Sequence, residues 1–334
     1  FVYTDNDEIG RLANNPNSKS CYSMINLNRL LQENPKLEKE MYDIEFHTRS
    51  LIARNNLKPG NGNGGGNGGG NGGGGSGGGG GEVTGVINIP VYVHVIYNNS
   101  NQNISDQQIN SQIDVLNEDF RRTNSDAGNT PSIFTGVAAD SEISFTLAGV
   151  TRTSSSVSSW GTNDAMKYAS NGGVDAITPE THLNIWVCNI GGGILGYAQF
   201  PGGPAATDGI VVGPQFFGRT GYLQAPFDKG RTATHEVGHY LNLRHIWGDG
   251  GCNVDDYVSD TPNAGGPNYT GSPCTFPGPN SCRPKGKPGQ PDDPDMFQNY
   301  MDYSDDTCMN LFTEGQKSRM RAIFASGGPR ESMY

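Results

Sequence analysis

Three histidines and one glutamate stand close together in the stretch HEVGHYLNLRH, at His235, Glu236, His239 and His245. His235 and His239 are four residues apart, so on a helix their side chains share one face and can hold one metal ion. A third imidazole from His245 leaves zinc an open fourth position, which a catalytic site requires. Zinc lowers the pKa of bound water, and Glu236 can take that proton as the water attacks a carbonyl. A histidine-rich surface helix, the alternative, is a poor account of this spacing.

Asn242 stands at a position where motifs of this kind usually have glycine. For His245 to reach the metal, the helix must end after His239 and the chain must turn sharply, usually through a left-handed residue. Asparagine is one of the few other residues that adopt this conformation readily. We therefore expect Asn242 to replace glycine at a cost of about 1 kcal/mol of strain and to leave the site intact.

The composition excludes some classes of protein. The chain has 334 residues, long enough for one large domain and a smaller segment, and its net charge is −11. This acidic balance argues against nucleic acid as a partner, because phosphate binding needs a basic face. The sequence has no run of about 18 apolar residues, so we expect no membrane span. The first residues, FVYTDNDEIG, lack a signal peptide's basic and apolar regions, so the protein is either cytosolic or has lost its signal.

Cysteine placement favours export. Four of the six cysteines lie in the Gly-, Pro- and Asp-rich segment 250–310, namely Cys252, Cys274, Cys282 and Cys308. An even set of cysteines in a segment with little apolar material predicts two disulfides that staple a loop. Zinc is the competing interpretation, but the segment has no paired CxxC spacing. Disulfides need an oxidising compartment, so we expect a secreted protein whose signal peptide is absent from this sequence.

Residues 60–81 are almost pure glycine with asparagine and one serine, and they predict a flexible linker. The linker separates an N-terminal segment, 1–59, from a domain that spans 82–334. Apolar residues in the N-terminal segment predict two short amphipathic helices on either side of Pro35, which are too little for an independent fold. We expect this segment to dock on the larger domain or to stay mobile.

The larger domain alternates predicted strands with predicted helices. Apolar or alternating runs predict strands at 86–98, 143–150, 182–190, 193–201 and 209–217. Ser105 is a candidate N-cap for one helix, the histidine motif predicts a second, and a third is expected at 313–324. This arrangement predicts an α/β or α+β fold with a mixed sheet.

HEVGHYLNLRH followed by NYMDYSDD at 299–306 resembles the metzincin metallopeptidases, and more narrowly the short prokaryotic branch of the pappalysin family. The resemblance covers about 86–330 of the chain. It implies an α+β metzincin fold: a twisted mixed sheet with an antiparallel edge strand, an active-site helix, a Met-turn and a C-terminal helix. GGGILGYAQFPG resembles the edge strand, which would pair with an extended substrate. The protein so implied is a secreted, monomeric zinc endopeptidase.

The resemblance also implies roles for residues outside the histidine motif. Met301 would be the Met-turn residue beneath the zinc, although ordinary core packing would also bury it. The hydroxyl of Tyr303 would point toward the metal and steady the oxyanion. The four loop cysteines would pair as Cys252–Cys282 and Cys274–Cys308.

CYSMINLNRLLQENPKL resembles the family's propeptide, in which a cysteine precedes a helix, so residues 1–59 would be a propeptide that inhibits its own enzyme. A thiolate from Cys21 would be a fourth zinc ligand, displace the nucleophilic water and keep the proenzyme latent. Activation would remove everything before about Glu82. The alternatives for Cys21 are a disulfide with Cys188 or an idle thiol.

The acidic loop after the histidine motif predicts a second metal. Asp255, Asp256, Asp260 and Thr261 offer hard oxygen ligands that suit calcium, and the resemblance implies calcium in this loop. The alternative is a solvated acidic turn.

The Met-turn runs on into Asp306, and the resemblance implies that this aspartate lies at the bottom of the pocket for the residue just after the scissile bond. A buried carboxylate there would select Arg, and less efficiently Lys, because a guanidinium can form two hydrogen bonds with it. The same preference would cut the propeptide before Arg49 or Arg54. The alternative is that Asp305 and Asp306 are solvated turn residues or calcium ligands.

Two other functions compete with a zinc endopeptidase. The first is an adhesion or binding module with an inert zinc site, which would have no use for Glu236. The second is a zinc esterase or deacetylase, which the Met-turn and the edge strand disfavour.

Overall fold

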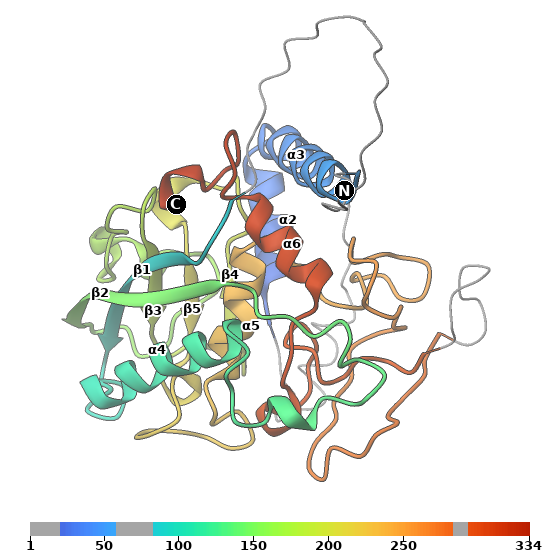
Figure 1. Ribbon diagram of the computed structural model, residues 1–334. Coiled ribbons are helices and arrows are strands. Elements are labelled where there is room, and N and C mark those ends of the chain that lie inside the picture. Colours follow the sequence, from blue (N-terminus) through green and yellow to red (C-terminus); the bar gives the residue numbers. More distant parts are fainter. Residues whose placement is uncertain (1–20, 58–82, 283–292) are drawn as a thin grey trace, which may run out of the picture.

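The computed structural model describes residues 21–57, 83–282 and 293–334, and its centre is a five-stranded sheet (Figure 1). The strands are β1 Ile87–Tyr97, β2 Ile143–Ser154, β3 Leu183–Val187, β4 Gly196–Ala198 and β5 Ile210–Val212, in the order β2-β1-β3-β5-β4. The neighbouring pairs from β2 to β5 are parallel, and β4 runs antiparallel to β5 at the edge. The predicted α+β fold with a mixed sheet and an antiparallel edge strand is confirmed.

Apolar strand sequences place the sheet inside the protein. Val91, Val93 and Val95 of β1 are fully buried and pair in parallel register with β3. A strand that is covered on both faces needs such a run of apolar residues. α4 (Asp106–Phe120) packs against β2, and Ser105 caps it by accepting a hydrogen bond from the Gln108 amide, as predicted.

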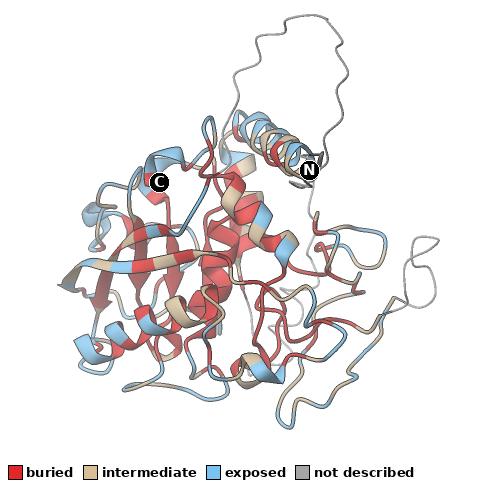
Figure 2. Ribbon diagram, in the orientation of Figure 1, coloured by how far each residue is buried: buried red, intermediate tan, exposed pale blue. Residues whose placement is uncertain are grey.

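α5 (Arg231–Tyr240) is the helix predicted from the histidine motif, and all of its residues are buried (Figure 2). It contacts α4, β4 and β5, so its polar side chains lie within the protein. α6 (Glu314–Ala322) begins after Thr313, which forms a capping box with Gln316. Short 3₁₀ helices lie at Ala127–Asn129, Ala165–Lys167, Ala169–Asn171, Ala205–Thr207, Pro214–Phe216, Asp306–Cys308 and Glu331–Met333.

Three strands are shorter than the sequence predicts, and β3 covers only Leu183–Val187 of the run 182–190. The run 193–201 contributes only β4, because Gly192 and Gly193 precede it with φ angles of 75° and 76°, which no strand has. The run 209–217 ends its strand at Val212, and Pro214, which has no amide hydrogen for a ladder, begins a 3₁₀ helix.

Two disulfides join described segments of the chain between α5 and α6. They join Cys252 to Cys282 and Cys274 to Cys308, with Cα atoms 5.4 Å apart in each pair, which is the pairing that the resemblance implies. Cys21 and Cys188 are both buried and lie outside any disulfide, so the alternative of a bond between them is wrong.

The described part of the N-terminal segment is a pair of helices docked on the larger domain (Figure 1). α2 (Ser23–Glu33) lies against β4, and α3 (Leu37–Leu57) lies against α6. The break at Pro35 is as predicted, but α3 is longer than the short helix expected. The predicted linker at 60–81 and Glu82 lie outside the described residues. Within the described ranges, none of the helices combines the length and apolar character that crossing a bilayer needs.

Candidate metal centre

α5 presents His235 and His239 on one face, and backbone carbonyls fix the orientation of both rings. His235 Nδ1 lies 2.7 Å from the carbonyl oxygen of Tyr300, and His239 Nδ1 lies 2.8 Å from that of Leu243. A carbonyl oxygen can only accept a hydrogen bond, so each Nδ1 carries the proton. Each Nε2 therefore turns a lone pair inward, which is the state in which histidine binds a metal.

Asn242 makes the turn that brings His245 to the same point. Its φ is 75°, the left-handed conformation that the sequence predicts for this position. The turn places His245 Nε2 3.1 Å from His239 Nε2. The other ring nitrogen of His245 contacts the carboxylate of Asp249, and Trp247 stacks on the ring with centroids 4.2 Å apart.

The residues at this point suit a zinc ion. His239 Nε2 lies 3.2 Å from His235 Nε2, and the three imidazole nitrogens and Cys21 Sγ all lie within 4.8 Å of one another. Lone pairs that converge at these distances repel each other unless a cation lies between them. Nitrogen and sulfur donors in a buried group of four are a set that zinc prefers. Among the described residues, this is the one group of His, Cys, Asp and Glu side chains that could hold a metal ion.

Met301 supports the helix from below, as the resemblance implies. It is fully buried, and its sulfur lies 2.3 Å from the place where a Cβ on Gly238 would stand. The carbonyl of the preceding residue, Tyr300, accepts the hydrogen bond from His235. The Met-turn therefore holds both the backbone of α5 and one of the histidine rings.

The hydroxyl of Tyr303 lies at the metal centre. It is 3.4 Å from the amide nitrogen of Cys21 and 3.3 Å from its carbonyl oxygen. The ring of Tyr303 packs beside His245 and Trp247, with centroids 5.1 Å and 4.9 Å away. The phenol is thus buried and held within the aromatic wall of the site.

Glu236 faces the N-terminal segment. Its Oε2 accepts hydrogen bonds from Cys21 Sγ at 3.2 Å and from Ser23 Oγ at 2.8 Å. Ser23 Oγ also accepts from the amide of Ala198 at 2.7 Å, and the Tyr22 amide donates to the Gly196 carbonyl at 3.1 Å. Residues 21–23 therefore lie along β4 and contact the glutamate at the same time. No pattern in the sequence indicates this role for Ser23.

Asp306 is fully buried, at the amino end of α5. Its Oδ2 accepts hydrogen bonds from the backbone amides of Lys229 at 2.9 Å and Arg231 at 3.2 Å. A carboxylate at this end of a helix is favourable, because the first amides have no partner within the helix. The alternative of Asp306 as a solvated turn residue is wrong.

The acidic loop does not bring its aspartates together as a metal cluster within the described residues. Asp256 accepts from the Val258 amide and the Thr261 hydroxyl, and burial raises its pKa well above the ordinary value. Asp260 instead accepts from the Thr313 hydroxyl and the Gly315 amide at the start of α6. These carboxylates tie loop turns and a helix start in place.

Two other buried aspartates support the centre, and the sequence analysis missed both. Asp249 lies four residues after His245, a spacing that could have indicated it. Asp119 of α4 accepts from the Thr234 hydroxyl at 2.8 Å and the Tyr300 hydroxyl at 2.7 Å, so it ties α4 to both α5 and the Met-turn. Burial raises the pKa of Asp119, against the nearby charge of Arg231.

Comparison with known proteins agrees with this geometry. Residues 175–325 match the peptidase M43 family, described as pregnancy-associated plasma protein-A. Extracellular metalloprotease 1 of Coccidioides posadasii is 37% identical over 247 residues, covering 71% of this chain and 77% of its own. An extracellular metalloprotease of Arthroderma otae is 33% identical over 256 residues, covering 72% of this chain and 78% of its own.

Two solved structures are also similar. Mirolysin in complex with compound 9 is 51% identical, with a TM-score of 0.69 and coverage of 75% of this chain and 96% of that one. The E225A mutant of Tannerella forsythia promirolysin is 43% identical, with a TM-score of 0.76 and coverage of 94% and 97%.

Proposed function

The chain belongs to the pappalysin family of metallopeptidases, and we propose that it is a secreted, monomeric zinc endopeptidase that its own N-terminal segment keeps latent. The names of its relatives, extracellular metalloproteases, support secretion. The likeness to promirolysin over 94% of this chain supports a propeptide at 1–59, a linker at 60–81 and a catalytic domain at 82–334.

His235, His239 and His245 hold the single zinc ion of this proposal. The observation that carries it is the convergence of their three Nε2 atoms: that of His239 lies 3.2 Å from that of His235 and 3.1 Å from that of His245. The Nδ1 atoms of His235 and His239 contact backbone carbonyl oxygens, so their Nε2 atoms are free of hydrogen. Zinc bound there supplies Lewis-acid chemistry: it polarises a peptide carbonyl and makes water more acidic.

Glu236 and Tyr303 do the remaining chemistry in this proposal. Glu236 takes a proton from the attacking water and later gives it to the leaving amine. Tyr303 donates its hydroxyl hydrogen to the carbonyl oxygen as negative charge develops there. Both side chains are buried, so their interactions with the reacting atoms are little screened by solvent.

Cys21 closes the site in the full chain. Its Sγ lies within the histidine group, where it takes the fourth position on the metal. Ser23 Oγ donates a hydrogen bond to Glu236 Oε2, and the Cys21 sulfur lies 3.2 Å from the same oxygen, so this oxygen is already covered before water could approach it. The backbone amide and carbonyl of Cys21 contact the hydroxyl of Tyr303, so this hydroxyl is covered as well.

The N-terminal segment also covers the substrate strand. Tyr22, Ser23 and Asn26 hydrogen-bond with the backbone of β4, at Gly196 and Ala198. An extended peptide that adds to the edge of the sheet needs these same groups. Release of the segment makes the metal, the base and the edge strand accessible together.

Asp306 selects Arg, and less efficiently Lys, for the position after the scissile bond in this proposal. A fully buried carboxylate supports the idea, because burial strengthens its demand for a charged partner. Its contacts with the Lys229 and Arg231 amides give it a second role as a helix cap. Any test must therefore separate specificity from folding.

Self-cleavage before Arg49 or Arg54 meets an obstacle in the fold. Both residues lie within α3, so the bonds before them are part of a helix. A protease cleft takes an extended chain, so α3 must detach and unwind locally before it is cut. We propose that the segment is released from the zinc before these bonds are cleaved.

Calcium in the acidic loop is a separate part of the proposal. Asp256 and Asp260 already accept hydrogen bonds within the protein, so calcium would have to share their oxygens. The test is the thermal unfolding midpoint of the full chain with calcium and with a chelator selective for calcium. A raised midpoint with calcium supports a site, and identical midpoints contradict it.

Casein hydrolysis and zinc content together test the proposed function. The processed protein should hydrolyse casein, and Glu236→Ala should lower turnover by several orders of magnitude while one zinc per chain stays bound. An inert zinc-binding adhesion module, the second candidate, predicts that zinc binds and that neither protein hydrolyses casein.

A further inference from the structure

Glu45 of α3 forms a buried ion pair between the N-terminal segment and the rest of the protein. Its two carboxylate oxygens accept hydrogen bonds from Arg319 of α6, at 3.1 Å and 2.8 Å. The side chain of Glu45 is 14% exposed and that of Arg319 is 1% exposed. Such a bidentate pair, largely excluded from solvent, is the geometry in which a guanidinium recognises a carboxylate best.

Arg319 is one of three arginines around a single aromatic ring. The guanidinium carbons of Arg244 and Arg319 lie 4.4 Å and 5.5 Å from the centre of the Tyr257 ring, and that of Arg49 lies 4.3 Å from it. Burial lowers the pKa of Arg244 to about 10, with a contribution from the charge of Arg319, although the nearby Tyr257 acts to raise it. Two buried arginines of the larger domain thus contact the same aromatic ring.

Asp249 and Asp256 act on the charge of Arg244, and Glu45 supplies a negative charge beside Arg319. Among the described residues, it is the one carboxylate within ion-pair distance of Arg319. Burial acts to raise the pKa of Glu45, but hydrogen bonds and charge from Arg319 and Arg49 outweigh it and lower the pKa. Glu45 leaves with the N-terminal segment, whereas Arg244, Tyr257 and Arg319 stay on the domain.

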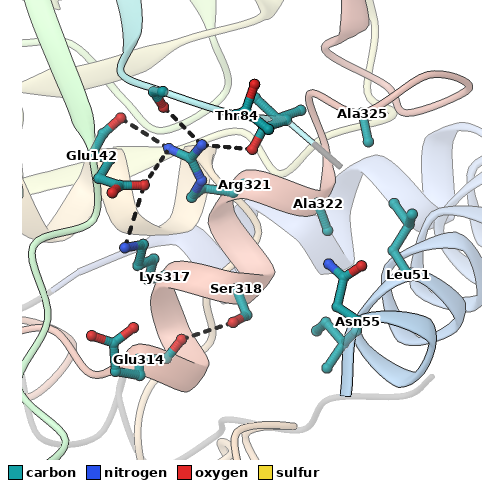
Figure 3. Close-up of a pocket in the computed structure, with 13 residues that line it drawn as sticks. Leu51, Asn55, Thr84, Glu142, Glu314, Lys317, Ser318, Arg321, Ala322 and Ala325 are labelled. Atoms are coloured by element: carbon teal, nitrogen blue, oxygen red, sulfur yellow. Dashed lines mark hydrogen bonds and ion pairs between the residues drawn. The ribbon is translucent and has the colours of Figure 1, made fainter. Parts of the chain in front are cut away.

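Elsewhere, uncharged contacts also hold α3 on the domain, because Leu37 and Leu51 are buried and Thr48 accepts a hydrogen bond from Asn242 at 3.4 Å. A cavity of about 440 Å³ separates its C-terminal part from α6, between Leu51 and Asn55 on one side and Lys317 and Arg321 on the other (Figure 3). Earlier on α3, Asp43 pairs only with Lys39 of the same helix, and both side chains are exposed. Glu45 therefore adds a charged contact with the domain to the uncharged contacts of α3.

The arginine cluster adjoins the metal centre. Arg319 donates to the carbonyl of Asn242 at 3.4 Å, in the turn between two of the histidines. Arg244 and Asn242 line a small hollow together with Phe200, whose ring centre lies 5.3 Å from that of His239. Phe200 follows β4 by two residues, so a peptide that extends along β4 leads toward the arginines.

We propose that Arg319, Arg244 and Tyr257 form a carboxylate-binding site of the catalytic domain, which Glu45 occupies in the full chain and an acidic side chain of a peptide occupies afterwards. The proposal rests on the proposed function only in that the N-terminal segment must be released. The ligand class is a peptide with Asp or Glu, because a carboxylate accepts from both outer nitrogens of one guanidinium as Glu45 does. The other possibility is that Glu45 is only one docking contact among many.

The first experiment uses the full chain, cut within the 60–81 linker but kept together as a complex. Release of the N-terminal piece is measured for wild type, Glu45→Gln and the matched control Asp43→Asn. E45Q removes the charge of one partner of a buried ion pair, so we expect it to weaken binding of the N-terminal piece at least tenfold. D43N changes an exposed pair within α3 and should leave this binding unchanged. Equal release of all three proteins would overturn the proposal.

The second experiment tests whether the site takes a carboxylate from a separate peptide. A labelled peptide of residues 37–57 and its E45Q and D43N variants are titrated onto the processed protein, and fluorescence anisotropy reports binding. We expect the E45Q peptide to bind about tenfold more weakly than the parent and D43N peptides. Arg319→Lys on the protein should reduce this difference in affinity, because lysine cannot donate two parallel hydrogen bonds to one carboxylate as a guanidinium does.

The outcomes separate this inference from the proposed function, since binding needs no turnover. Charge-dependent binding to a protein that hydrolyses nothing would overturn the proposed function alone. An active protease that binds the parent and E45Q peptides equally would overturn the carboxylate site alone.

Discussion

The sulfur of Met301 lies 2.3 Å from the position that a Cβ on residue 238 would take, so Gly238 and Met301 pack without room for one more carbon. Gly238 is the residue before the metal-site histidine His239, and Met301 is fully buried beneath it. The contact sets the distance between the backbone of α5 and the Met-turn. It also explains why the motif HEVGH carries its smallest residue on this face.

Gly238→Ala should therefore destabilise the protein although alanine favours helix. The added methyl must displace Met301, and overpacking of a filled core costs about 1–3 kcal/mol. Thermal unfolding should show a lower midpoint, and zinc should bind more weakly because the histidines move. Gly136→Ala is the control, since a Cβ there meets nothing within 4 Å. A midpoint as high as that of the control would contradict the packing argument.

Asp249→Asn should weaken zinc binding. The carboxylate of Asp249 contacts Nδ1 of His245 and orients its ring, and losing such a partner typically lowers metal affinity by about 10–100-fold. Competition with a chromogenic chelator measures the affinity. Asp140→Asn, which removes the surface pair with Arg121, should leave it unchanged. Equal affinities for the two variants would show that Asp249 does not orient the ligand.

Asp306→Asn should change specificity more than stability. Asparagine keeps an oxygen for the Lys229 and Arg231 amides, but it removes the negative charge. The ratio of kcat/KM for peptides with Arg and with Leu after the scissile bond should fall at least about tenfold. If kcat/KM fell for both peptides and their ratio stayed the same, Asp306 would act only as a helix cap and not in specificity.

Acid should loosen the N-terminal segment through Glu45. The pKa of Glu45 is lowered from its ordinary 4.5 in the folded protein, so its contribution is present above that value and is lost as pH falls through the lowered pKa. In the cut full chain, release of the segment should rise below about pH 4.5 more steeply in wild type than in Glu45→Gln. Identical pH profiles would show that protonation of other groups releases the segment.

Much of the metal centre could be predicted from local spacing. The distance between His235 and His239 in sequence fixes a shared helix face, and the need for a sharp turn before His245 indicates a left-handed Asn242. The fold agrees on both points, since α5 is a helix and Asn242 has a φ of 75°. Each of these inferences depends on a few neighbouring residues, so the sequence contains what they require.

The remaining contacts join distant parts of the chain, and no local pattern indicates them. Asp119 meets Thr234 and Tyr300 only because α4 packs on α5. Glu45 and Arg319 are likewise separated by nearly the whole chain, and each is an ordinary charged residue on a helix. Ser23 reaches Glu236 because Cys21 and Tyr22 lie along β4, a docking path that the sequence does not specify.

X-ray absorption at the zinc edge, on the purified full chain, tests the central claim most directly. We predict one zinc per chain with three nitrogen ligands from His235, His239 and His245 and one sulfur from Cys21. In the Cys21→Ala variant, the sulfur should give way to a light atom while the three nitrogens remain, and the full chain should either activate itself faster or hydrolyse casein without cleavage of the segment. A wild-type spectrum with nitrogen and oxygen ligands alone, or a chain that binds no zinc, would contradict the account.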